Sequence, residues 1–311
     1  MSEAAAPPRL ATRAAIASVA VALFLLGLKT FAAAETHSVA LLGSLADSAL
    51  DVVASLVTLF GVHVAAMPAD DDHRFGHGKA ESLAALVQVG IIAVSAIGIG
   101  WRAVERLLAG EATRQAEYGI AVSLVAIAAT LALLAYQRSV IRRTGSVAIQ
   151  ADHVHYQNDL LLNLSVIAAL LLDENLGLTG ADPLFGMAIA AWLLFGAVRA
   201  SRVAIDQLMD KEWPEERRIA FARAAGDHPA SRGVHDLRTR TSGAHQFAQF
   251  HIWVDPRMSV AEAHDVMEEI EARLALDFPG VEVLIHLDPE GQVDQPGNAL
   301  AETNLTPQGS A

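Results

Sequence analysis

Long apolar stretches dominate the first two-thirds of the chain. Each is long enough to cross a hydrocarbon layer about 30 Å thick as a helix, since such a helix needs roughly 17–25 residues. Charged residues are rare inside them, as expected of helices that face lipid. The stretches cover residues 14–34, 38–66, 83–108, 118–136, 146–172 and 183–205. The pattern therefore predicts an all-α membrane domain of six transmembrane helices.

The pattern changes near residue 209, where charged residues become frequent and apolar runs become short. Residues 234–241 and 246–254 alternate between apolar and polar side chains, which is typical of half-buried strands. The period of an amphipathic helix fits residues 215–227 and 260–278, and residues 281–287 fit a third strand. The order α-β-β-α-β predicts a small two-layer α+β domain.

These patterns divide the chain into four parts. We expect an N-terminal cytoplasmic tail over residues 1–13, the transmembrane domain over 14–208, the α+β domain over 209–290 and a disordered tail over 291–311. The last part is rich in Gly, Pro, Gln, Asn and Thr without hydrophobic periodicity, so it has too few apolar residues to bury a core.

Composition restricts the chemistry that this chain can perform. Hydrophobic residues make up 53% and aromatic residues only 5%, so aliphatic side chains supply most of the apolar surface. The absence of cysteine excludes thiolate ligands, and any metal must bind through oxygen and nitrogen. The net charge of −13 argues against binding to nucleic acid. A phosphate-binding Gly-x4-Gly-Lys-[Ser/Thr] loop is also missing, which argues against nucleotide-driven pumping.

Lysine and arginine are distributed unevenly among the segments that connect the apolar stretches. Segments 35–38 and 173–182 contain none, whereas the N-terminal tail and segments 68–79, 138–143 and 199–211 contain several. Cytoplasmic loops of membrane proteins carry the excess of basic residues. We therefore expect both termini to lie in the cytoplasm.

Two of the predicted spans carry ionisable residues four positions apart. Asp47 and Asp51 lie in the second span, and His155 and Asp159 lie in the fifth. Residues at this spacing share one face of a helix. A charge near the bilayer centre costs about 2.5–3.5 kcal/mol on insertion scales, so both faces are expected to turn toward each other. Three carboxylates and one imidazole would then form a cage for Zn²⁺, Cd²⁺, Fe²⁺ or Mn²⁺.

Two other interpretations of these four residues remain open: a structural hydrogen-bond network with protonated carboxylates, and a proton relay. On the metal interpretation, protons compete with the ion for the same ligands, so metal loading releases protons. A cage that faces the two sides of the membrane alternately would act as a metal/proton antiporter. The higher proton concentration normally found outside the cell would then drive metal efflux.

Further candidate ligands lie outside the spans. Asp70, His73 and His77 occur in one loop, and the alternative there is a solvated acidic loop with incidental histidines. Lys79 follows this loop and is a candidate partner for an acid such as Asp210. The C-terminal domain contains scattered histidines, which are more often surface or core residues than ligands. Its candidate ligands are His235, His251, His264, His286 and Asp288.

Five motifs contain most of these candidates. They are SLADSALD at 44–51, ADDDHRFGHGKAE at 69–81, HYQND at 155–159, HDLRTR at 235–240 and IHLDP at 285–289. Together they resemble the cation diffusion facilitator family, particularly its bacterial zinc and ferrous-iron efflux branch. The resemblance extends over about residues 9–290.

The resemblance implies a homodimer in the bacterial cytoplasmic (inner) membrane, with six spans per subunit and a C-terminal domain of ferredoxin-like, metallochaperone-like fold. It implies that the four intramembrane residues form the transport site and that the loop residues form a second site. The five C-terminal candidates would form a binuclear site at the cytoplasmic dimer contact, and Lys79 with Asp210 a charge interlock. The expected function is efflux of Zn²⁺, and also of Cd²⁺ or Fe²⁺, in exchange for protons, with no enzymatic activity and no cofactor beyond the metal.

Other functions remain possible on the same residues. A membrane-anchored metal sensor would bind metal in its C-terminal domain even with the intramembrane acids neutralised, and it would transport nothing. A passive channel would pass metal without proton movement. A transporter of the same design could instead prefer Mn²⁺ or Fe²⁺, because oxygen and nitrogen ligands do not decide between these ions.

Overall fold

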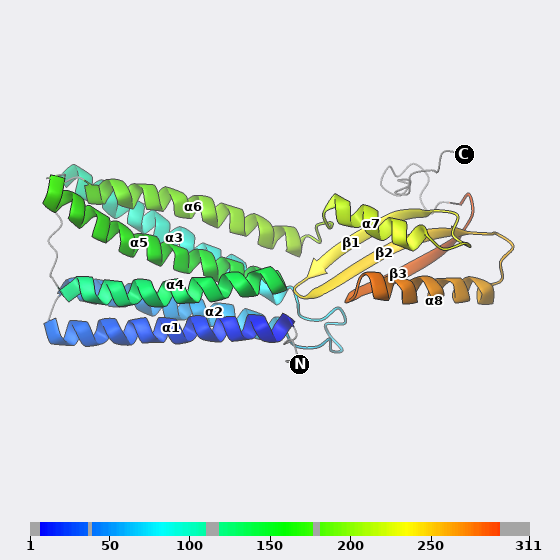
Figure 1. Cartoon of the computed structure of the whole chain (residues 1–311), viewed down its shortest axis with the longest axis horizontal. Helices are drawn as coiled ribbons and strands as arrows, with labels where there is room; N and C mark the ends of the chain where they lie inside the picture. The colour runs from blue at the N-terminus through cyan, green and yellow to red at the C-terminus, as the bar shows by residue number, and fades with distance from the viewer. Residues whose placement is uncertain (1–6, 37–38, 110–117, 177–180, 293–311) are drawn as a thin grey trace. The chain divides into compact units, whose positions relative to one another are not determined.

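The chain forms two compact units, Met1–Ile205 and Asp206–Ala311. Long helices build the first unit, and a small sheet with two helices builds the second (Figure 1). The structure is a computed structural model that describes residues 7–36, 39–109, 118–176 and 181–292. The predicted tail over 291–311 lies almost entirely outside these residues.

Six helices of 27 to 30 residues form the described part of the first unit. They are α1 (Pro7–Thr36), α2 (Val39–Ala65), α3 (Ala80–Ala109), α4 (Tyr118–Thr144), α5 (Val147–Leu176) and α6 (Ala181–Leu208). Within the described residues, every one except α5 contains a stretch long and apolar enough to cross a membrane. Helix α5 equals the others in length but carries several polar groups, so its assignment as the sixth span stays a prediction.

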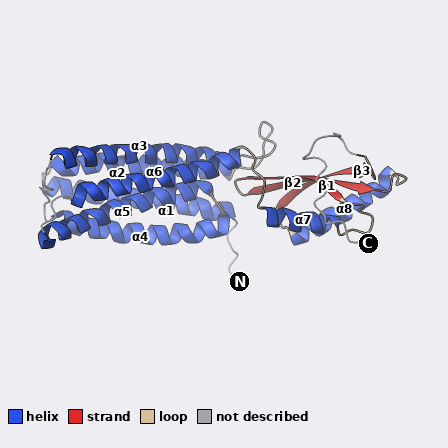
Figure 2. Ribbon diagram, turned by 90° about the horizontal axis from the view of Figure 1, so that it is seen from above, coloured by secondary structure: helices blue, strands red, loops and turns tan. Residues whose placement is uncertain are grey.

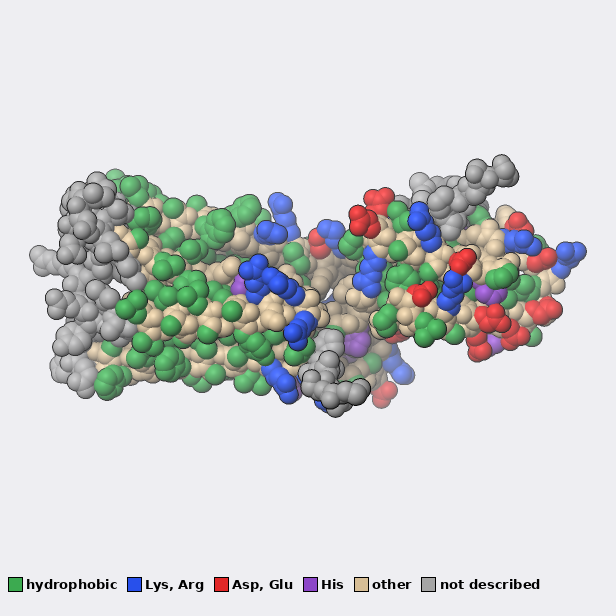
Figure 3. Space-filling view, in the orientation of Figure 1, with side chains coloured by type: hydrophobic (Ala, Val, Ile, Leu, Met, Phe, Trp, Pro, Cys, Tyr) green, Lys and Arg blue, Asp and Glu red, His purple; other side chains and the backbone are tan. Residues whose placement is uncertain are grey.

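Apolar side chains are spread over the face of this unit that Figure 3 shows. Phe60, Val94, Trp101 and Leu108 are each at least 70% exposed. Such a surface would associate in water, but lipid chains solvate it in a bilayer. The first unit is therefore a membrane domain.

Small residues allow its helices to approach closely. A Cβ atom built on Gly61 of α2 would lie only 2.2 Å from the Cβ of Ala84 on α3. Helix α3 also packs on α6 through the buried side chains of Ile92 and Leu193. Close packing of this kind holds membrane bundles together, because lipid removes the hydrophobic force between helices. Helix α5 contacts α2, α3 and α4 within this bundle (Figure 2).

The second unit has the element order that the sequence predicts. Helix α7 (Glu215–Gly226) precedes strands β1 (Val234–Ser242) and β2 (His245–Val254), and helix α8 (Val260–Asp277) precedes strand β3 (Val281–Pro289). The described sheet has the order β1-β2-β3, with β1 antiparallel and β3 parallel to β2. The ferredoxin-like assignment goes further than this three-stranded arrangement and stays a prediction.

Both helices of this unit cover the same face of the sheet (Figures 1 and 2). Phe221 of α7, Leu274 of α8 and Phe250 of β2 are fully buried in one apolar core between the two layers. Because side chains alternate along a strand, His251 and Trp253 point to the opposite face, which neither of the two described helices of this unit covers. Polar side chains on that face can therefore meet without entering the core.

Candidate metal centres

Side chains from α2 and α5 converge inside the membrane domain. The Nε2 atom of His155 lies 3.2 Å from Oδ1 of Asp51 and 3.9 Å from Oδ2 of Asp159. Ligand atoms of a tetrahedral zinc site with bonds of about 2.0–2.1 Å are about 3.3 Å apart, so the spacing suits such an ion. The imidazole is 5% exposed, and its Nε2 has no hydrogen-bond partner among the described residues. A cation or a proton bound between the carboxylates would satisfy this nitrogen.

The fourth predicted ligand, Asp47, precedes Asp51 by one turn of α2. Its side chain lies outside the described part of the structure, so its place in the cage stays a prediction.

A buried polar network lies beside this cage and connects α1, α2, α4 and α5. The hydroxyl of Tyr156 donates to the carbonyl oxygen of Ser18 at 2.8 Å and lies 2.9 Å from the hydroxyl of Ser55. The Nε2 atom of Gln137 donates to Asp152 at 2.8 Å and to the hydroxyl of Ser18 at 3.0 Å. The network fixes the rotation of α5, which also carries His155. Neither Tyr156 nor Gln137 was predicted as a site residue, because contacts between distant helices leave no periodic signal in the sequence.

The loop between α2 and α3 brings its three candidate residues together. Asp70 lies 3.2 Å from Nδ1 of His73 through one carboxylate oxygen and 3.3 Å from Nε2 of His77 through the other. A hydrogen bond from the backbone N–H of His73 holds the pKa of the Asp70 carboxyl below its ordinary value, with a smaller contribution from the imidazoles. Asp70 is therefore an anion that can attract a cation to this exposed loop.

Three strands of the C-terminal sheet bring a second group together. His235 of β1 pairs in register with His251 of β2, which pairs with His286 of β3. The carboxylate of Asp288 lies at the centre of these imidazoles. Its Oδ2 atom is 3.1 Å from Nε2 of His235 and 2.9 Å from Nδ1 of His251, and its Oδ1 atom is 3.1 Å from Nε2 of His286. Four of the five predicted C-terminal ligands thus contact one another.

The fifth predicted ligand, His264, lies apart from this group within the described chain. It is 55% exposed on α8, and its Nε2 atom lies 3.2 Å from Oε1 of Glu268, one turn further along the same helix. Its participation in a binuclear site stays a prediction.

An aromatic ring supports the C-terminal group. The indole of Trp253 stacks on the imidazole of His235, with ring centroids 4.3 Å apart. Burial lowers the pKa of His235 more strongly than the nearby Asp288 raises it, so the imidazole stays neutral at pH 7. A neutral imidazole has the free lone pair that a metal requires.

The predicted charge interlock has one member in each unit. Lys79 precedes α3, and Asp210 follows α6 with an unusual positive φ of 55°. Within its own unit, Asp210 lies 3.8 Å from a guanidinium nitrogen of Arg240. The pairing of Lys79 with Asp210 stays a prediction.

The three groups share one property. In the described residues, Asp51, His155 and Asp159, then Asp70, His73 and His77, and finally His235, His251 and Asp288 each offer three ligand atoms within 4.8 Å of one another. Every ligand atom is a carboxylate oxygen or an imidazole nitrogen, the donor set that the cysteine-free composition predicts.

Comparisons with known proteins agree with this arrangement. The family model of the cation efflux transmembrane domain matches residues 15–209, and that of the cation efflux protein, cytoplasmic domain, matches residues 213–290. The latter is a dimerisation domain, which indicates a homodimer. The family transports divalent metals and is not enzymatic.

Curated relatives extend over almost the whole chain. The cation-efflux pump FieF of Pectobacterium atrosepticum is 42% identical over 92% of this chain and 95% of its own length. FieF of Klebsiella pneumoniae is 41% identical over 92% of this chain and 95% of its own length. A solved structure of CzrB in its zinc form shares 35% identity over 28% of this chain and 100% of that chain, with a TM-score of 0.26, too low to bear on the fold. Because both family models match and the relatives align over almost their whole length, the chain belongs to the cation efflux family, also called the cation diffusion facilitators.

Proposed function

We propose that this protein exports a divalent transition-metal cation by metal/proton antiport with alternating access. Zn²⁺ is the first candidate substrate, with Cd²⁺ and Fe²⁺ as further ones. The observation that carries the proposal is the convergence of Asp51, His155 and Asp159 inside the membrane domain. Ionisable groups at that depth are costly and are expected to serve an ion pathway.

The chemistry of the cage supports exchange with protons. An imidazole binds metal only when neutral, and carboxylates bind it only when ionised, so metal and protons compete for the same atoms. Metal that enters from the cytoplasm displaces protons from His155 and the carboxylates. Protons that enter from outside then return to these atoms and release the ion. Asp47 completes the proposed donor set from α2.

The remaining sites are proposed to serve this cycle. The protein lies in the bacterial inner membrane with both termini in the cytoplasm, as the distribution of Lys and Arg favours. The loop residues around Asp70 collect the cation, and the C-terminal group around Asp288 senses its concentration as a homodimer contact. The interlock of Lys79 with Asp210 joins the two units during the conformational change.

Reconstitution into liposomes tests the proposal. Purified protein is incorporated into vesicles that contain a zinc-sensitive dye or a pH-sensitive dye, and zinc is added outside. Wild type is expected to move zinc and protons in opposite directions. Asp51→Ala and His155→Ala are expected to reduce both signals to those of protein-free vesicles. The control variant is Glu105→Ala, which removes an exposed carboxylate of α3, outside the cage, and is expected to transport like wild type.

Each contrary result has a distinct meaning. Zinc movement without proton movement would replace antiport by a channel. Zinc binding without flux, unchanged in Asp51→Ala, would favour the membrane-anchored sensor. A parallel series with Cd²⁺, Fe²⁺ and Mn²⁺ ranks the substrates, and faster Mn²⁺ or Fe²⁺ flux than Zn²⁺ flux would favour the transporter with that preference.

A further inference from the structure

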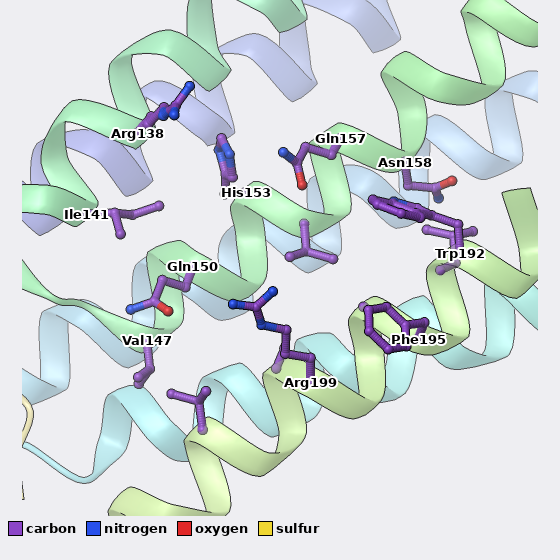
Figure 4. A pocket seen from close by; sticks show the side chains of 15 residues that line it. Arg138, Ile141, Val147, Gln150, His153, Gln157, Asn158, Trp192, Phe195 and Arg199 are labelled. Atoms are coloured by element: carbon purple, nitrogen blue, oxygen red, sulfur yellow. The ribbon is translucent and has the colours of Figure 1, made fainter. Parts of the chain in front are cut away.

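A cavity of about 560 Å³ opens between α4, α5 and α6 in the membrane domain (Figure 4). Its lining combines two cationic side chains, Arg138 of α4 and Arg199 of α6, with neutral polar groups of α5 such as Gln150 and Gln157. Apolar side chains of α6 complete it, among them Trp192 and Phe195. The cavity is distinct from the cage, because it contains neither Asp51 nor His155 nor Asp159.

The two arginines give the cavity a positive charge that its own lining does not neutralise. Among the described residues, no acidic side chain lines it. Both guanidinium groups belong to stretches that are apolar enough to cross a membrane, Ser123–Thr144 and Pro183–Leu208. Arginine at such positions is stable when it reaches the interface or pairs with an anion. The cavity therefore selects for an anionic group, and it is unsuited to a metal cation.

The apolar part of the lining indicates where the remainder of the ligand lies. Arg199 and Trp192 are seven residues apart on α6, two helical turns and about 10 Å along the axis. Trp192 and Phe195 are 61% and 65% exposed, so their rings also face the lipid region outside the cavity. A ligand with a charged headgroup and an apolar chain fits this order along α6, from the guanidinium of Arg199 to the rings of Phe195 and Trp192.

We propose that this cavity binds the phosphate headgroup of an anionic phospholipid from the cytoplasmic leaflet. The phosphate lies between Arg138 and Arg199, both of which can donate charge-assisted hydrogen bonds to its oxygens. Gln150 and Gln157 donate to the remaining oxygens, and the acyl chains run along Trp192 and Phe195. Basic pockets between helices on the cytoplasmic side are suited to anionic headgroups in this way. The choice of leaflet rests on the proposed orientation, but the site itself does not.

Lipid binding to the full chain tests this proposal. Detergent-purified protein is titrated with phosphatidylglycerol or phosphatidylcholine of the same acyl chains, and bound lipids are counted by native mass spectrometry. The paired variant Arg138→Gln/Arg199→Gln removes both cavity charges. The matched control, Arg142→Gln/Arg202→Gln, removes two exposed arginines from the same helices that do not line the cavity.

Wild type and the control pair are expected to bind phosphatidylglycerol in preference to phosphatidylcholine. The cavity pair is expected to lose about tenfold or more in phosphatidylglycerol affinity, since two phosphate contacts disappear. Arg138→Lys/Arg199→Lys retains both charges and is expected to recover much of the affinity, which guards against a variant that merely folds poorly.

Three results would overturn the proposal. An equal loss in the control pair would mean that surface charge attracts the lipid without a site. Equal binding of the two lipids would remove the role of the anionic headgroup. Displacement of phosphatidylglycerol by inorganic phosphate at millimolar concentration would identify the ligand as free phosphate.

Discussion

Asp288 provides a sharp test of the C-terminal group, because one carboxylate there contacts three imidazoles. Replacing it in Asp288→Asn keeps the size of the side chain and removes the charge. One of its two oxygens becomes an amide nitrogen that cannot bind a metal or accept a hydrogen bond. If Oδ2 is replaced, His235 and His251 lose their hydrogen-bond partner. If Oδ1 is replaced, His286 loses its contact with a carboxylate oxygen.

The expected magnitude follows from these roles. Removing a partner that orients metal ligands typically costs 10–100-fold in affinity, or about 1.4–2.8 kcal/mol. Asp288 both orients three imidazoles and offers a ligand oxygen, so we expect the upper end, about 100-fold weaker zinc binding. His228→Ala is the matched control, since His228 pairs with Glu269 and lies outside the group.

Fluorescence of Trp253 isolates this site from the others. Its indole stacks 4.3 Å from the ring of His235, so metal binding there changes its environment, and Trp253→Phe identifies its share of the signal. Full-length protein in detergent is stripped with a chelator and titrated with zinc. An affinity of Asp288→Asn within about twofold of wild type would refute the assignment of Asp288 as the central group.

The same titration has a pH dependence with a defined sign. Burial lowers the pKa of His235 below its ordinary value of 6.5, and Asp288 opposes this shift. Zinc affinity of wild type should therefore persist below pH 6.5 and decline as the pH falls through the lowered pKa. Removing the charge of Asp288 removes this opposing contribution, so the pKa of His235 is expected to be lower still in Asp288→Asn. The difference in zinc affinity between wild type and the variant should therefore narrow as the pH falls.

Two further predictions concern stability. Gly61→Ala places a Cβ 2.2 Å from that of Ala84 and should destabilise the α2–α3 contact by about 1–3 kcal/mol. The measurement is thermal unfolding in detergent, where the variant should unfold at a lower temperature than wild type. Gly90→Ala is the control, because its new Cβ meets nothing within 4 Å, and it should unfold like wild type. At the start of α8, the backbone N–H of Ser259 donates to Glu262 and lowers the pKa of its carboxyl from 4.5. This contact should slow hydrogen exchange of the amides in the first turn of α8 above pH 4.5, and the effect should disappear as the pH falls through the lowered pKa of Glu262. Exchange rates are corrected for their intrinsic dependence on pH. Glu262→Gln should show no such change.

Local patterns of the sequence predict most of what this structure contains. The pair His155 and Asp159 lies on one helix, so its geometry follows from a spacing of four residues. The loop group around Asp70 is also local, because its three residues lie in one short loop. Contacts between distant segments follow from no such spacing. The hydrogen bond from Tyr156 to Ser18 and the stacking of Trp253 on His235 therefore had no signal in the sequence. A prediction of strand pairing could have brought His251 and His286 together, because both occupy the same face of neighbouring strands.

The position of His235 depends on a detail that hydrophobic alternation does not contain. From Ser242 to Arg238, strand β1 pairs with β2 in one regular register, and this register would place His235 opposite Ile252 on the face of the apolar core. A β-bulge between His235 and Arg238 inserts one extra residue and shifts the pairing to His251. Asp236 occupies the bulge with a positive φ of 47°, a conformation that aspartate tolerates better than most residues. The bulge therefore turns His235 away from the core and toward Asp288, and a single irregular residue assembles a group that a regular sheet would divide between its two faces.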